Sequence, residues 1–366
     1  MFTKEMRKTH RILMPSMLPI HFEIFVSVFR REGYDVELLR TQSPKIVQTG
    51  LKYVNNDTCY PAILVIGQFI HALQSGKYDP DRTALMITQT GGGCRASNYI
   101  HLLRKALISS GFENVPVISL NLAGIERTDG FTITLDMLRK MIAAAMYGDE
   151  IMLLSNQVRP YEETSGQTDA IVNEMIRRTG SMLAGGEGYS LGDMTRTMRD
   201  IAQAFAHIPV VERKTIKTGI VGEIYVKYSP LANNNLEAFL ASHGCEVMLP
   251  GVMNFLTRSL HSSIYDNDVY GGGIAAATGM KAVMGYLRML ETAMIKAVSE
   301  TYLRPPATFE QIRRAVGGVI GEGVKMGEGW LLTGEMLDMA NEGFENILCL
   351  QPFGCLPNHI VGRGML

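Results

Sequence analysis

Short apolar runs alternate with segments of helical spacing between Arg11 and Leu120, and this alternation limits the fold more than any other feature of the chain. Strands that alternate with helices are typical of βαβ units, whose strands pair in parallel. We expect strands at Arg11–Met14, Asp35–Leu39, Thr83–Thr88 and Val115–Leu120, and helices at Ile20–Glu32, Ala62–Leu73 and Ala96–Ser110. The first part of the chain is therefore predicted to be an α/β lobe with a parallel sheet.

The pattern changes twice further along the chain. Helical spacing replaces the strand signal at Leu135–Tyr147, Thr168–Met182 and Leu191–Ala206. A β-branched run then restarts the α/β pattern, with strands expected at Thr218–Val226, Glu246–Leu249 and Asn346–Gln351, a helix at Asn235–His243, and long helices up to Ala340. We predict an α/β protein with two lobes, residues 1–130 and 211–366, and a helical insert at residues 131–210.

Composition excludes several classes of function. Lys plus Arg (35) balances Asp plus Glu (36) without a dense basic run, so nucleic acid is not an expected partner. The apolar stretch Ala62–Leu73 is interrupted by Gln68 and His71 and is too short to span a bilayer, so no membrane partner is expected. The N-terminus lacks the apolar core of a signal peptide. A cytoplasmic protein is the resulting expectation.

Cysteine usage points to reduced thiols or metal ligands. The chain has 5 cysteines, an odd number, and none forms a CxxC pair, which argues against a secreted disulfide framework. Cys245 falls between a predicted helix and a strand, and Cys349 lies inside an apolar strand. We interpret these two cysteines as structural.

The other three cysteines share one kind of position. Cys59 precedes Pro61 in a polar turn, Cys94 follows the strand Thr83–Thr88 through a run of glycines, and Cys355 follows the strand Asn346–Gln351. Open α/β sheets build their sites outside the carboxyl ends of their strands. At a helix N-terminus the pKa of a thiol falls from about 8.5 to roughly 3.5 to 7.5. We therefore expect three thiolates at one edge of the fold.

Thiolates bind iron, and the spacing of these three suits a site between lobes. The gaps are 94 − 59 = 35 and 355 − 94 = 261 residues, whereas structural zinc sites prefer four ligands in close-spaced pairs. We predict that Cys59, Cys94 and Cys355 hold one 4Fe-4S cluster in a cleft between the lobes, with an open position on one iron. The residues expected to line this cleft are Tyr60, Gly93, Arg95, Glu223 and Asn358. For the segment from Gly219 to Asn235, a plain turn with a helix N-cap is an equally good interpretation.

Other interpretations of the same residues stay open. A cluster-free ligand-binding or scaffold module is the main rival, because free cysteines in cytoplasmic proteins are usually buried and structural. Gly91, Gly92 and Gly93 alone could form a phosphate loop, but no GxxxxGK[ST] or GxGxxG motif accompanies them. A thiol or zinc hydrolase is a third interpretation, but the sequence shows no candidate general base at a recognisable spacing from the cysteines. Convergence of the three sulfurs on one point is the observation that separates a cluster site from its main rival.

Four segments carry a resemblance to a known family: Asn55–Pro61, Gly91–Asn98, Gly222–Asn235 and Gln351–Ile360. They resemble the 2-hydroxyacyl-CoA dehydratase superfamily, especially its acyl-CoA dehydratase activase-related (2-hydroxyglutaryl-CoA dehydratase-like) branch. The resemblance implies two flavodoxin-like, Rossmann-like lobes with a helical part. It also implies a 4Fe-4S cluster on the cysteines that match Cys59, Cys94 and Cys355.

The resemblance further implies an anaerobic electron-transfer function. Dehydratases of this superfamily accept an electron from an ATP-dependent activase and remove water from a 2-hydroxyacyl-CoA through a ketyl radical. This chain would then be a low-potential electron acceptor or a radical dehydratase component, acting on a small molecule or acyl-CoA. As an enzyme it would be a lyase or the reductase component of an ATP-coupled system. The sequence has no activase nucleotide site, so the activase would be a separate chain or a fused part. A dimer of this chain is also possible as a partner arrangement.

Overall fold

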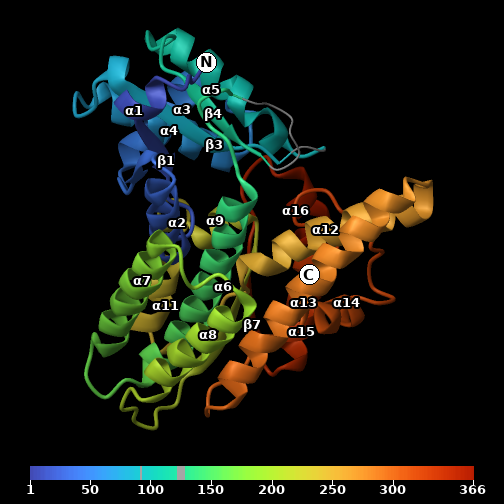
Figure 1. Ribbon diagram of the computed structural model, residues 1–366. Coiled ribbons are helices and arrows are strands. Elements are labelled where there is room, and N and C mark those ends of the chain that lie inside the picture. The colour runs from blue at the N-terminus through green and yellow to red at the C-terminus, as the bar shows by residue number, and fades with distance from the viewer. Residues whose placement is uncertain (91–92, 122–127) are drawn as a thin grey trace.

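Figure 1 shows the computed structural model, which describes residues 1–90, 93–121 and 128–366. In this part of the chain, seven strands form two parallel sheets, one in the order β2-β1-β3-β4 and the other in the order β6-β5-β7. Long helices pack around both sheets. The α/β class with parallel sheets is therefore confirmed.

The first sheet follows the sequence pattern closely. Its strands are β1 (Arg11–Pro15), β2 (Asp35–Leu39), β3 (Thr83–Thr88) and β4 (Val117–Leu120). β2 and β3 have the predicted bounds, and β4 starts two residues later than predicted. Pro116 lacks an N–H for a ladder bond, although its carbonyl still accepts a hydrogen bond from Leu85 N–H at 2.9 Å. Apolar runs buried on both faces explain why these strands could be recognised.

Helices cover this sheet on both sides. They are α1 (Met6–Thr9), α2 (Pro19–Arg31), α3 (Pro44–Tyr53), α4 (Tyr60–Gln74), η1 (Pro80–Arg82), η2 (Arg95–Asn98) and α5 (Tyr99–Ser110). α3 was not predicted. It begins where the Ser43 side chain accepts a hydrogen bond from Lys45 N–H, with Pro44 at the first helical position, which is a common helix start.

α3 and α4 touch through two glycines. A Cβ added to Gly67 would lie 2.8 Å from Gly50 N and closer still to the backbone oxygen of Ile46. Gly67→Ala is therefore expected to lower the free energy of unfolding by about 2 kcal/mol, because overpacking outweighs the better helix propensity of alanine. Urea denaturation measures the change. The matched control is Gly279→Ala on another helix, where no atom lies within 4 Å, and this variant is expected to gain up to about 1 kcal/mol. Equal effects in the two variants would contradict the close helix contact.

Three α-helices and one short 3-10 helix follow the first sheet: α6 (Leu135–Val158), η3 (Arg159–Tyr161), α7 (Gln167–Gly185) and α8 (Leu191–Ala206). They lie below the first sheet in Figure 1, in green and yellow-green. α6 continues well beyond the predicted end at Tyr147, and every residue from Ala143 to Val158 is buried. It contacts α2, α7 and α8 and also β6 and α12, so it links the first lobe to the second.

The second sheet consists of β5 (Ile216–Gly222), β6 (Cys245–Met248) and β7 (Asn346–Leu350). The prediction of a strand through Val226 is wrong, because β5 ends at Gly222 and α9 (Ile224–Tyr228) follows at once. Gly222 has a φ of 138°, which favours glycine, and a Cβ there would meet the Leu350 backbone. The predicted strand Thr218–Val226 is rich in β-branched residues, and for this reason the sequence pattern does not indicate the turn at Gly222.

The remaining helices lie in the second half of the chain. They are α10 (Pro230–Asn233), α11 (Leu236–Ser242), α12 (Val252–Tyr270), α13 (Ile274–Ser299), α14 (Phe309–Ala315), α15 (Trp330–Asn341), α16 (Leu356–Val361) and η4 (Arg363–Met365). Among them, α11 packs against β6 and α15 against β5 and β7. The glycine run after Tyr270 separates α12 from α13. Among the helices that the structure describes, none is long and apolar enough to cross a membrane.

Asp149 of α6 connects this helix to α2 and α12 through hydrogen bonds. Its Oδ1 accepts hydrogen bonds from His21 Nε2 of α2 at 2.7 Å and from Val252 N–H at 2.8 Å, and its Oδ2 accepts one from Met253 N–H at 2.9 Å. The N-cap of α12 is Gly251, which has no side chain to cap the helix. Asp149 therefore caps α12 from another helix.

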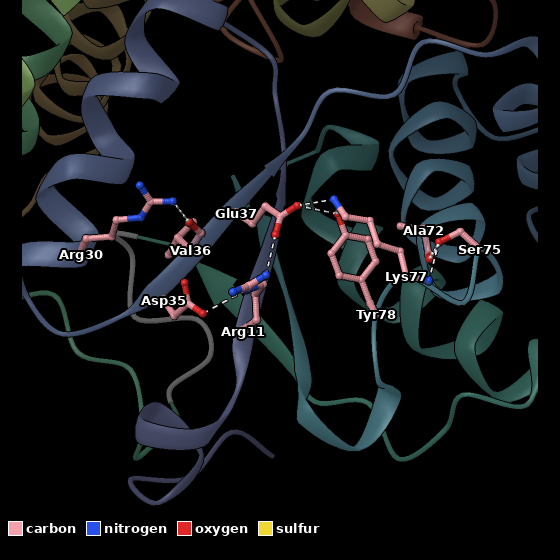
Figure 2. Close-up of polar contacts among 9 residues, drawn as sticks. All are labelled: Arg11, Arg30, Asp35, Val36, Glu37, Ala72, Ser75, Lys77 and Tyr78. Atoms are coloured by element: carbon pink, nitrogen blue, oxygen red, sulfur yellow. Dashed lines mark hydrogen bonds and ion pairs between the residues drawn. The ribbon is translucent and has the colours of Figure 1, made fainter. Parts of the chain in front are cut away.

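The amino-terminal side of the first sheet carries an exposed network of charges. Figure 2 shows Arg11 between Asp35 and Glu37, with Lys77 and Tyr78 on the other side of Glu37. The ion pairs of Arg11 are 3.0 Å long, and its side chain is 49% exposed. Solvent-exposed pairs of this kind add about 0 to 1 kcal/mol each. The network is thus a surface feature that contributes little to stability.

Candidate metal centre

The structure places each of the three predicted ligands at a helix N-terminus. Cys59 is the N-cap of α4, Cys94 of η2 and Cys355 of α16, and each has an extended backbone. Tyr60 and Arg95 are the first residues of their helices, so they directly follow two of these cysteines. Cys94 follows β3 and Cys355 follows β7, as predicted, whereas Cys59 lies in the connection between α3 and α4, so the predicted strand-to-helix turn is wrong for Cys59.

The turns that carry Cys59 and Cys355 pack against each other. Tyr60 N–H donates a hydrogen bond to the backbone oxygen of Phe353 at 3.0 Å. Gly354 has a φ of 72°, and a Cβ added to it would lie 3.1 Å from the Cα of Cys59. A larger residue would strain this turn and press on its neighbour. Glycine at this position thus lets the two cysteine-bearing turns approach closely.

Cys94 lies in the turn that follows β3. Two of its three preceding glycines, Gly91 and Gly92, lie outside the described residues. Gly93 packs against Met326, since a Cβ there would be 3.0 Å from the methionine sulfur. Cys94 is close enough to Cys59 that the charge of one raises the pKa of the other thiol, after the larger effect of burial. The three turns therefore meet in one region of the molecule.

Two of the thiols have side-chain hydrogen bonds. The Cys59 Sγ and the Tyr99 hydroxyl are 2.8 Å apart, and either atom can donate. Asn358 Nδ2 donates to the Cys355 Sγ at 3.2 Å. The Asn358 side chain is fully buried, and its Oδ1 has no partner among the described residues. A buried amide oxygen without a donor is thus available beside Cys355.

Two carboxylates lie beside the thiols. Glu223 is the N-cap of α9, and its Oε2 accepts a hydrogen bond from Val226 N–H at 2.9 Å. Glu328 accepts hydrogen bonds at 2.8 Å from Ile224 N–H and from Asn358 Nδ2, one on each oxygen. Burial and the negative charge of Glu328 raise the pKa of Glu223 to about 8. Sequence reasoning missed Glu328, which lies in a connection without a recognisable motif.

The expected lowering of the thiol pKa values is wrong. Burial raises the pKa of Cys59, Cys94 and Cys355, in the last case to about 12, and the negative charge of Glu223 raises all three further. Backbone N–H groups at the helix ends lower these values, but by less than burial raises them. A metal bound at these thiols would therefore have to displace protons.

The three thiols meet in one region without forming a ready donor set. Among residues 1–90, 93–121 and 128–366, no group of three His, Cys, Asp or Glu side chains is arranged to hold a metal ion. Cys59 is hydrogen-bonded to Tyr99 and Cys355 to Asn358. Side-chain rotation away from these partners would be needed before the three sulfurs could share one ligand.

The remaining cysteines differ in position. Cys245 is the first residue of β6 and therefore lies at the amino end of a strand, as predicted. Cys349 lies within β7, where a Cβ added to Gly362 would meet its Sγ at 2.9 Å. These two residues supply matched controls for replacements at the other three.

Comparison with protein-family models, curated proteins and solved structures finds no match to this chain. The superfamily resemblance of the four segments therefore stays a prediction.

Proposed function

We propose that this protein is a 4Fe-4S protein of the 2-hydroxyacyl-CoA dehydratase type, with Cys59, Cys94 and Cys355 as cluster ligands. One observation carries the proposal. Three cysteines from distant parts of the sequence are the N-cap residues of helices, and the turns of Cys59 and Cys355 are joined by the hydrogen bond from Tyr60 N–H to Phe353. Structural cysteines have no reason to share this position.

Strand order supports two flavodoxin-like lobes. The order β2-β1-β3-β4 is the start of the flavodoxin-like order 2-1-3-4-5, and β6-β5-β7 reads 2-1-3 when the second sheet is numbered by itself. Ligands in such folds bind where the strand order reverses. Glu223 follows β5 and Cys355 follows the turn after β7, the two strands at that point. Cys94 follows β3 of the first sheet in the same way.

The kinds of group present fit an iron-sulfur cluster. Thiolates are the usual cluster ligands. When bound, the cluster would supply a low-potential electron. The chain's own part would be to hold the three sulfurs, to donate from Asn358 Nδ2 to one of them, and to exclude water from the buried thiols of Cys59 and Cys355.

The electron donor and the reaction class rest on the resemblance of the four sequence segments. They support an ATP-dependent activase as the reductant and a small molecule or acyl-CoA as the substrate. The protein would then act as an electron acceptor or as the radical dehydratase component, a lyase. An α/β fold with parallel sheets is compatible with either role.

The rival function is a cluster-free ligand-binding or scaffold module. The observation that favours it is the raised pKa of all three thiols, since buried neutral thiols are typical of structural cysteines. In this case the polar turns would bind a metabolite or a partner subunit. Iron binding distinguishes the two functions.

The test is anaerobic reconstitution with ferrous iron and sulfide, followed by iron and acid-labile sulfide analysis and a visible spectrum. We expect about four irons and four sulfides per chain. The triple variant Cys59→Ser, Cys94→Ser, Cys355→Ser is expected to lose them, whereas the control Cys245→Ser, Cys349→Ser keeps them. If the unaltered protein is folded by circular dichroism and binds no iron, the cluster proposal is wrong and the binding module is favoured.

A further inference from the structure

A second candidate site, whose lining includes no cysteine, lies beside the carboxyl end of β6. A cavity of about 70 Å³ opens there between α6, α12, α13, α14 and α15. That volume exceeds what one water needs. Its apolar wall includes Met146, Leu153, Met253, Leu287, Met294 and Met339. Methionine side chains adapt to ligands of varied shape, so this wall suits an apolar body of a few carbon atoms.

The polar part of the cavity is mainly acidic. Asp149, Glu291, Glu335 and Asp338 line it, against one cationic side chain, Arg288. Both oxygens of Asp149 already accept hydrogen bonds within the protein, three in total. Glu291 accepts one from Phe309 N–H at 2.6 Å. The cavity therefore carries a negative charge that its own residues balance only in part.

Two of the four carboxyl groups retain free acceptors. Glu335 is 3% exposed, and its Oε2 pairs with Lys227 Nζ at 3.2 Å, but its Oε1 has no partner among the described residues. Asp338, one turn further along α15, has no side-chain partner in the described chain either. A buried acceptor without a donor is costly, so a ligand that donates hydrogen bonds would be stabilised at this point.

We infer that this cavity binds a small organic cation with an apolar body, such as an alkylammonium ion. The ammonium group would donate to Glu335 Oε1 and Asp338, and the alkyl chain would lie against the methionines. A metal ion fits less well, because no three His, Cys, Asp or Glu side chains of the described residues are arranged to hold one, and both oxygens of Asp149 already accept hydrogen bonds within the protein. This binding function is independent of the cluster.

The unaltered protein can be tested with n-butylammonium chloride at pH 8 by calorimetry and by tryptophan fluorescence. Trp330 is the single tryptophan, and its ring lies 5.6 Å from that of Phe309, which lines the cavity. We expect one n-butylammonium per chain and a saturable change of Trp330 emission. 1-Butanol, of nearly the same shape, is expected to bind at least about tenfold more weakly, and butyrate not at all. Equal affinity for n-butylammonium and 1-butanol would overturn the inference.

A pair of variants locates the site. Asp338→Asn removes the charge from the cavity and is expected to weaken n-butylammonium binding at least about tenfold. Glu345→Gln removes an exposed carboxylate outside the cavity and is expected to leave binding unchanged. Unchanged binding in a folded Asp338→Asn protein would contradict this site. The comparison with 1-butanol needs no variant, so a folding defect of Asp338→Asn leaves the inference falsifiable.

Discussion

Lys227→Met is expected to lower the free energy of unfolding by about 3 to 5 kcal/mol at pH 8, measured by urea denaturation. Lys227 is 4% exposed and Glu335 is 3% exposed, and their side chains form an ion pair of 3.2 Å. Removal of the cation leaves a carboxylate buried without an opposite charge. The cost of this uncompensated charge exceeds what the pair itself contributes to stability.

The pH dependence identifies the cause of this loss. Burial raises the pKa of Glu335 above 4.5, the charge of Lys227 opposes the shift, and the charges of Glu328 and Asp338 add to it. Without Lys227 the pKa of Glu335 rises further. The destabilisation is then fully present above this raised pKa and disappears as the pH falls below 4.5, because Glu335 then becomes protonated in both the folded and the unfolded chain.

Two further variants test the same explanation. The double variant Lys227→Met, Glu335→Leu is expected to regain most of the lost stability, because no buried charge is left. Lys281→Met serves as the control, since Lys281 and Asp268 form an exposed pair of 3.5 Å, and its effect should stay below about 1 kcal/mol. A double variant as unstable as Lys227→Met would show that the shape of Lys227, rather than its charge, is what the fold needs.

Asp149→Ala is expected to cost at least about 4.5 kcal/mol, because hydrogen bonds to a charged group contribute roughly 1.5 to 3 kcal/mol each and three are lost. Asp149 is 6% exposed, so its partners would be left buried without an acceptor. They belong to α2 and to the first turn of α12. Thermal unfolding with a single transition at a lower temperature is the expected observation.

The control for this variant is Asp169→Ala. The Asp169 side chain is 64% exposed, and its pair with Arg159 measures 2.9 Å. Its removal should cost less than about 1 kcal/mol. If Asp149→Ala were no more harmful than Asp169→Ala, the junction between α2, α6 and α12 would not depend on this carboxylate.

Local patterns predicted the regular elements of the fold well. β2, β3 and α8 have the predicted bounds, because their apolar periodicity is complete and their ends carry clear turn residues. α6 was predicted too short, since a helix buried on all sides has no polar face to show its period. The sequence pattern predicts a strand after Gly222, because the residues there favour strands. The structure has the short helix α9 at this point, since tertiary contacts can override the local preference.

The candidate site was predictable in its positions but not in its energetics. Cys59, Cys94 and Cys355 could be placed at helix N-termini, since a glycine or proline stands beside each of them where a helical pattern begins. Their pKa values depend on how deeply the lobes bury them, and a local motif carries no such information. Glu328 could not be found at all, because its partners Ile224 and Asn358 are distant from it along the chain.

The contact between Tyr60 and Phe353 sets an order of events during protein synthesis. These residues are 353 − 60 = 293 positions apart, so their hydrogen bond forms only after the ribosome has added nearly three hundred residues beyond Tyr60. Cys59 and Cys94 leave the ribosome long before the turn of Cys355 exists. A group that binds to all three turns can therefore be inserted only after synthesis has passed Cys355. Until then, the thiols of Cys59 and Cys94 lack the Cys355 turn that packs beside them.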